Sequence, residues 1–186
     1  MAGKRFHKRL IYFLAISAAV LFAAGLLQTS FFPQLGLFGA VPDLVLILVC
    51  GAAFYLGPVD GAMLGLVGGI IIEGLAGFGL ALSPLLYLLL GVLFGALSIK
   101  MFRGKFWHYA VYSVMFCAAK AVYSVARIAL SPNGDRLGAA LLCAVLPEFV
   151  ATLLLALLLA APTRGFAGVL RGRMSEKKGK GGLGDL

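Results

Sequence analysis

The chain has 186 residues, of which 62% are hydrophobic and only 12% are charged. Its mean hydropathy of +1.04 excludes a water-soluble domain with a polar surface and indicates an integral membrane protein. The formal net charge is +9, but the lysine and arginine residues cluster beside apolar segments, which argues against nucleic-acid binding and points to membrane topology.

The first apolar segment, residues 10–27, follows a basic and cytoplasmic N-terminus, residues 1–9. It is longer than the apolar core of a typical signal peptide and further spans follow, so we expect a retained membrane anchor. The next segment, residues 28–41, is rich in aromatic residues and carries no positive charge. This composition predicts a short element at the outer membrane interface, or a contact with a partner.

Pro42 and Asp43 open a second apolar run that ends near Leu56. Proline is tolerated at a helix start, and an acid is favourable near the positive end of the helix dipole. A helix of about 15 residues reaches only about 22 Å, so this span has to tilt, thin the bilayer or include Val41 and Gly57.

Glycine recurs at four-residue steps in the third apolar segment. We call Gly57, Gly61, Gly65, Gly69 and Gly77 the glycine ladder, and Glu73 occupies its missing step. Residues four apart lie almost above one another on an α-helix, so the ladder forms a groove without side chains. Small residues at this spacing let helices approach closely in a bilayer. An acid at membrane depth is unfavourable unless it faces protein or water, which makes Glu73 a candidate functional residue.

Three further apolar runs predict three more spans: residues 85–99, 107–130 and 137–161. Pro147 interrupts the last of these spans. Lysine and arginine outside the spans place both termini and the 100–105 loop on the cytoplasmic side. The sequence therefore predicts an all-α integral membrane protein, with one six-helix transmembrane bundle over residues 10–161. The glycine- and lysine-rich tail, residues 162–186, is expected to be disordered in the cytoplasm and to attract anionic lipids.

Aromatic and basic residues recur at steps of three and four along the fifth span and so share one helical face: Tyr109, Tyr112, Phe116, Lys120, Tyr123 and Arg127. One interpretation is an internal ion-pair network, in which Glu73 and Glu148 neutralise the two cations of this face. Other interpretations are a proton relay, or a ligand or partner site lined by Tyr112, Tyr123, Lys120 and Arg127.

The sequence lacks a catalytic constellation. The only histidines, His7 and His108, fall at the cytoplasmic boundary, far from the acids of the spans, so neither a metal site nor a nucleophile with its base is predicted. The three cysteines lie singly in apolar runs, as buried small hydrophobic residues do. We therefore predict a protein that is not an enzyme and that needs no cofactor.

A longer pattern runs from about residue 27 to residue 95. It consists of Gln28, Pro33, Pro42 and Asp43, then the glycine ladder with Glu73 and Leu80, then Leu85 and Tyr87. This pattern resembles the rod shape-determining protein MreD family. The family usually has aspartate where this chain has Glu73, which keeps the carboxylate, and often has glycine where this chain has Ala81.

The resemblance implies a non-enzymatic component of the bacterial cell-elongation machinery, located in the inner membrane. Such proteins partner MreC and, with it, help control RodA and its penicillin-binding partner in peptidoglycan synthesis. The resemblance also implies a six-helix fold similar to the S components of energy-coupling-factor vitamin transporters. On this scaffold hypothesis, partner helices bind a surface formed by Pro42, Asp43, Gly61, Gly65, Gly69, Glu73 and Gly77.

Two other functions are compatible with the sequence. A vitamin-binding S component is the first, because Ala15, Ala19 and Ala23 have the small-residue spacing with which such subunits dock on their coupling partner. Spacing of this kind is common in membrane helices and separates the two functions only weakly. The second is a small membrane protein of unrelated role, whose glycine ladder packs its own bundle.

Overall fold

The computed structural model describes residues 2–35, 41–76, 83–100, 106–129, 138 and 145–175. Within these ranges the chain is helical apart from short connections, so the predicted all-α class is confirmed. The α-helices are α1 (Ala2–Leu26), α2 (Leu44–Leu56), α3 (Pro58–Ala76), α4 (Ser83–Lys100), α5 (Phe106–Ala129), α7 (Leu146–Leu158) and α8 (Ala160–Ser175). A π-helical turn, Leu27–Phe31, and a 3-10 turn, Phe32–Leu35, prolong α1.

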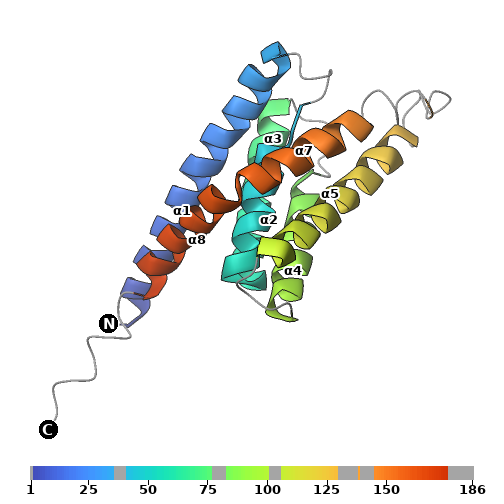
Figure 1. Ribbon diagram of the computed structural model, residues 1–186. Coiled ribbons are helices and arrows are strands. Elements are labelled where there is room, and N and C mark those ends of the chain that lie inside the picture. The colour runs from blue at the N-terminus through green and yellow to red at the C-terminus, as the bar shows by residue number, and fades with distance from the viewer. Residues whose placement is uncertain are drawn as a thin grey trace, which may run out of the picture.

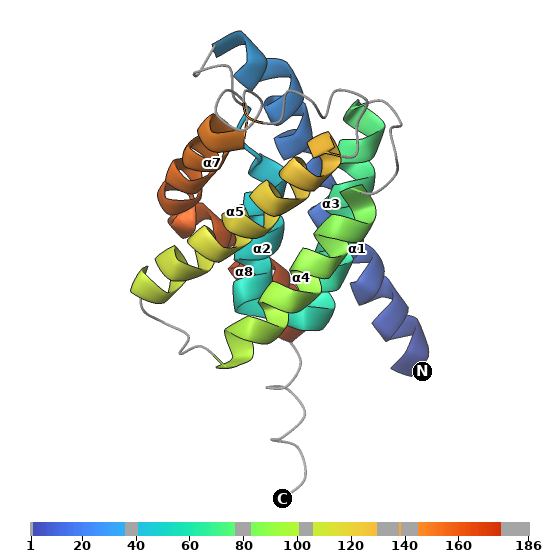
Figure 2. The ribbon, with the colours of Figure 1, turned by 90° about the vertical axis from the view of Figure 1, so that its right-hand side faces the viewer.

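Helix α2 lies at the centre of the molecule and contacts each of the other six α-helices (Figures 1 and 2). Ten of its 13 residues are buried. Its sequence is apolar on all sides, which is typical of a helix surrounded by protein.

The glycine ladder packs α3 directly on the backbone of α4. A Cβ atom added to Gly61 would lie 2.5 Å from the carbonyl oxygen of Gly91, and one added to Gly65 would lie 2.2 Å from that of Tyr87. A Cβ atom added to Gly69 would lie 2.4 Å from the Cα atom of Pro84. Real Cβ atoms essentially never come within 3.0 Å of another residue, so only glycine permits this approach.

This packing corrects the proposed partner surface. Gly61, Gly65 and Gly69 are buried against a helix of the same chain, so they are not free to receive a partner helix. Close approach between helices was predicted from the spacing of the glycines, but the spacing does not say which helix fills the groove. Gly77 lies outside the described residues.

The last two helices differ from the predicted sixth span. α7 and α8 are bent by 62° where the chain passes Leu159 (Figure 1). Pro147 lies in the first turn of α7, a position where proline is tolerated, and the residues before Val145 in the predicted span, other than residue 138, lie outside the described residues. Residues 162–175 belong to α8, which corrects the expectation of a disordered tail over this range. The cause is a helical repeat of buried residues, Thr163, Ala167 and Leu170, on a helix that packs on α1 and α2.

Three helical segments of the described chain are long and apolar enough to cross a membrane: Ile11–Gln34, Pro58–Leu75 and His108–Ala126. If the bent pair of α7 and α8 is counted as one span, the described chain has four candidate spans. α2 and the Ser83–Ser98 part of α4 are apolar but shorter. The described residues thus support a helical membrane protein with three or four spans, fewer than the six expected, because α2 and α4 are short.

Candidate functional site

Polar side chains from the π-helical turn after α1, from the N-cap of α2 and from α7 meet at the start of α2, where backbone N–H groups lack partners inside the helix. The Asp43 carboxylate is the N-cap and accepts a hydrogen bond from the Leu46 N–H at 2.9 Å. The Gln28 side-chain oxygen accepts from the Val45 N–H at 3.3 Å, and the Thr152 hydroxyl oxygen accepts from the Asp43 N–H at 3.2 Å. Residues distant in sequence therefore fix this helix end.

The second oxygen of the same carboxylate belongs to an ion-pair network, which we call the Lys120 bridge. Lys120 of α5 donates hydrogen bonds from Nζ to Asp43 Oδ2 and, at 2.5 Å, to Glu148 Oε1 of α7. The Tyr87 hydroxyl of α4 donates to the same Asp43 oxygen. The Lys120 bridge comprises Asp43, Tyr87, Lys120 and Glu148. It links α4, α5 and α7 to the start of α2 through one ammonium group and one carboxylate oxygen.

Burial differs along the Lys120 bridge. The Asp43 side chain is 1% exposed, that of Lys120 is 16% exposed and that of Glu148 is 27% exposed. Ionised groups away from water are unfavourable unless they are paired and hydrogen-bonded, and each of these three is paired. Removing one member would leave a charge without its partner.

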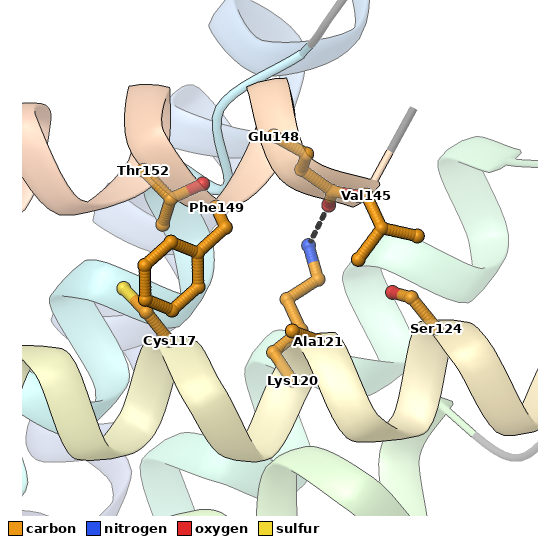
Figure 3. Close-up of a pocket in the computed structure, with 8 residues that line it drawn as sticks. All are labelled: Cys117, Lys120, Ala121, Ser124, Val145, Glu148, Phe149 and Thr152. Atoms are coloured by element: carbon orange, nitrogen blue, oxygen red, sulfur yellow. Dashed lines mark hydrogen bonds and ion pairs between the residues drawn. The ribbon is translucent and has the colours of Figure 1, made fainter. Parts of the chain in front are cut away.

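A small cavity adjoins the Lys120 bridge between α5 and α7 (Figure 3). Its volume is about 10 Å³, which holds about one water molecule. It is lined by Cys117, Lys120, Ala121, Ser124, Val145, Glu148, Phe149 and Thr152. In Figure 3 the Lys120 side chain extends from α5 toward Glu148 on α7, so the bridge spans the gap between these two helices.

The aromatic end of the α5 face is packed inside the protein. Tyr112 is fully buried among Phe54, Phe94 and Phe116, with ring centroids 4.8, 5.1 and 5.9 Å away. Its hydroxyl donates a 2.9 Å hydrogen bond to the backbone oxygen of Cys50. Tyr112 is therefore occupied within the core, which corrects its place in a ligand site on this face.

The structure brings together some of the predicted site residues. The structure contains one of the predicted ion pairs, that of Lys120 with Glu148. It also contains an ion pair of Lys120 with Asp43, which the sequence had suggested only as a helix start and partner contact. Glu73 is buried on α3, at 9% exposure. The Arg127 side chain lies outside the described residues.

The sequence did not identify Tyr87, Thr152 or Gln28 as members of this polar centre. Gln28 was expected at the membrane interface, but it is buried and reaches α2. Thr152 is the only hydroxyl-bearing residue of α7 and is flanked by apolar residues. This isolated hydroxyl was the one feature of the α7 sequence that could have indicated its role. Pro42, expected at a partner surface, is buried.

No family model matches this chain, no curated protein matches it, and no solved structure matches it. The functional conclusion therefore rests on the residues and their geometry. Among the described residues, no group of three or more histidine, cysteine, aspartate and glutamate side chains is placed to hold a metal ion. The polar groups of the Lys120 bridge bind one another, which suits them to hold helices together.

Proposed function

We propose that this protein is a non-enzymatic membrane scaffold of the bacterial cell-elongation complex, similar to MreD. It would lie in the inner membrane with six spans, with α2 and α4 as short spans and both termini in the cytoplasm. Its partners would be an MreC-like single-span protein and, through it, RodA and a penicillin-binding protein. The start of α1 and the end of α8 lie at the same end of the molecule, which supports this topology (Figure 1).

One observation supports the proposal above the others. Gln28, Asp43 and Tyr87 are among the residues that carry the resemblance to MreD. They lie in the π-helical turn after α1, at the N-cap of α2 and in α4, respectively. All three meet at the start of α2, through the hydrogen bonds of Gln28 to Val45 and of Tyr87 to Asp43. The pattern therefore marks one structural centre, as expected if it maintains a common fold.

The position of the partner surface has to be revised within this proposal. The glycine ladder is covered by α4, so partner helices would bind apolar faces that the chain leaves exposed. One such face is a ridge of residues four apart on α7: Leu146, Val150, Leu154 and Leu158. Anionic lipids would bind basic residues at the cytoplasmic ends of the helices.

The alternative of a vitamin-binding S component has less support. The cavity beside Lys120 is about 10 Å³, whereas small-molecule sites measure about 300–1,000 Å³. Two larger apolar grooves, of 460 and 490 Å³, are lined only by apolar residues. A vitamin carries polar groups that would need partners there.

A co-purification experiment tests the proposal. The full chain, tagged and produced in a rod-shaped bacterium depleted of its own MreD, is expected to restore rod shape and to capture the MreC-like protein in detergent. Fusions of a reporter to either terminus should report the cytoplasm. Rounded cells with no capture of that protein would overturn the scaffold function, as would a stoichiometric vitamin found by mass spectrometry of the purified chain.

A further inference from the structure

Helix α7 is weakly packed for a helix of its length. Only two of its 13 residues are buried, Thr152 and Ala156, whereas α2, also of 13 residues, has ten. Apolar grooves lie on both sides of it. One, of 460 Å³, separates it from Phe32 and Pro42, and the other, of 490 Å³, separates it from Val122 and Val125 of α5. Phe149, Leu153 and Leu155 pack against the hydrophobic core but are only partly buried, so apolar packing fixes α7 less firmly than α2.

Polar contacts hold the first half of α7. Glu148 accepts the hydrogen bond from Lys120 at 2.5 Å, and Thr152 accepts the hydrogen bond from the Asp43 N–H at 3.2 Å. These two residues are four apart and so lie on one face, which meets α2 and α5. Both contacts lie in the N-terminal half of α7.

The other end of α7 has the geometry of a hinge. Leu159 is the single residue between α7 and α8, and the axes of the two helices differ there by 62°. α8 is anchored, because Thr163, Ala167 and Leu170 are buried and the Thr163 hydroxyl lies 3.3 Å from that of Tyr109. A fixed helix, a one-residue break and a loosely packed helix are the parts that a hinge motion needs.

We propose that the Lys120 bridge and the Thr152–Asp43 hydrogen bond together form a latch that holds α7 against α5 and α2, and that breaking either contact lets α7 turn away about Leu159. The motion opens the small cavity between α5 and α7 and exposes the thiol of Cys117, which is buried in its wall at 3% exposure. It also changes the exposed face of α7. The inference concerns the movement of this helix and does not depend on the proposed function.

Two buried cysteines make the motion measurable in the full chain. Cys117 lines the cavity of the latch, whereas Cys50 is fully buried in α2, the central helix. In a Cys143→Ala chain reconstituted in lipid nanodiscs, the rate of N-ethylmaleimide labelling at each thiol is followed by peptide mass spectrometry. A thiol that reacts only after a local opening reports the population of the open state.

Glu148→Gln removes the charge that faces Lys120 while keeping the side-chain shape. We expect labelling of Cys117 to rise about 10- to 100-fold, the equivalent of losing one hydrogen bond to a charged group, with no change at Cys50. Thr152→Val breaks the second contact without altering charge, and labelling should rise about tenfold. Thr163→Val is the matched control, since it breaks a buried contact of α8 and should leave Cys117 protected.

Three results would overturn the latch. If labelling of Cys117 is unchanged in both Glu148→Gln and Thr152→Val, the polar contacts do not hold α7. If Cys50 and Cys117 become reactive together, the variants unfold the bundle as a whole. If only Glu148→Gln has an effect, the lost charge has altered thiol reactivity and α7 has not moved. Thr152→Val alone decides the question if Glu148→Gln does not accumulate.

Discussion

Replacing Gly65 by alanine tests whether the glycine ladder is an internal packing surface. The added Cβ atom would lie 2.2 Å from the carbonyl oxygen of Tyr87, 2.6 Å from its carbonyl carbon and 2.9 Å from the Cα atom of Leu88. All three are backbone atoms, which cannot rotate away as a side chain can. To restore ordinary contact at 3.4 Å, α3 and α4 have to separate by about 1.2 Å at this point.

The expected loss follows from two opposing effects. Inserting a methyl group into a close-packed contact costs about 1–3 kcal/mol, and the upper end applies here because the separation also loosens the contacts of Gly61 and Gly69. Alanine favours the helical backbone over glycine by about 1 kcal/mol. We therefore expect Gly65→Ala to lower the free energy of unfolding by about 2 kcal/mol.

The assay is equilibrium unfolding of the purified chain in mixed micelles, followed by circular dichroism as the denaturing detergent is increased. Gly74→Ala is the matched control on the same helix, because nothing lies within 4 Å of its added Cβ atom and Gly74 is exposed. It should be neutral or stabilising by up to about 1 kcal/mol. Equal stabilities of the two variants would refute the packing of α3 on α4.

Further predictions follow from the same contacts. Lys120→Met leaves Asp43 and Glu148 without their cation and should cost about 3–5 kcal/mol in the same titration; a loss below about 1 kcal/mol would contradict the ion pairing. Leu21→Ala, at a fully buried position, should cost about 2–5 kcal/mol, whereas Phe22→Ala, at 48% exposure on the same helix, should cost less. Truncation after residue 175 should preserve the unfolding transition, whereas truncation after residue 159, which removes α8, should broaden or abolish it.

Local sequence patterns predicted the local features of the fold well. The predicted span over residues 107–130 corresponds to α5 at Phe106–Ala129, and the acid at the start of the second run is the N-cap of α2. Glycine at four-residue steps indicated close helix contact, which α3 makes with α4. These features depend on helical periodicity and capping, which act over a few residues.

Features that depend on long-range contacts could not be predicted in the same way. Asp43 and Lys120 are 77 residues apart, and nothing in either neighbourhood indicates that they pair. The helix α8 was missed for a different reason. Glycine and charged residues dominate the composition of residues 162–186. The composition of the whole segment therefore hid the helical repeat of Thr163, Ala167 and Leu170, which are buried.

The Lys120 bridge also constrains how the protein is made. The chain is synthesised from its N-terminus, so Asp43 reaches the membrane 77 residues before Lys120 and more than a hundred before Thr152, which is 109 residues away. Until Lys120 has been made, Asp43 lacks the cation that it pairs with in the folded chain, and an unpaired acid is unfavourable away from water. The start of α2 therefore reaches its final packing only after α5 has been made.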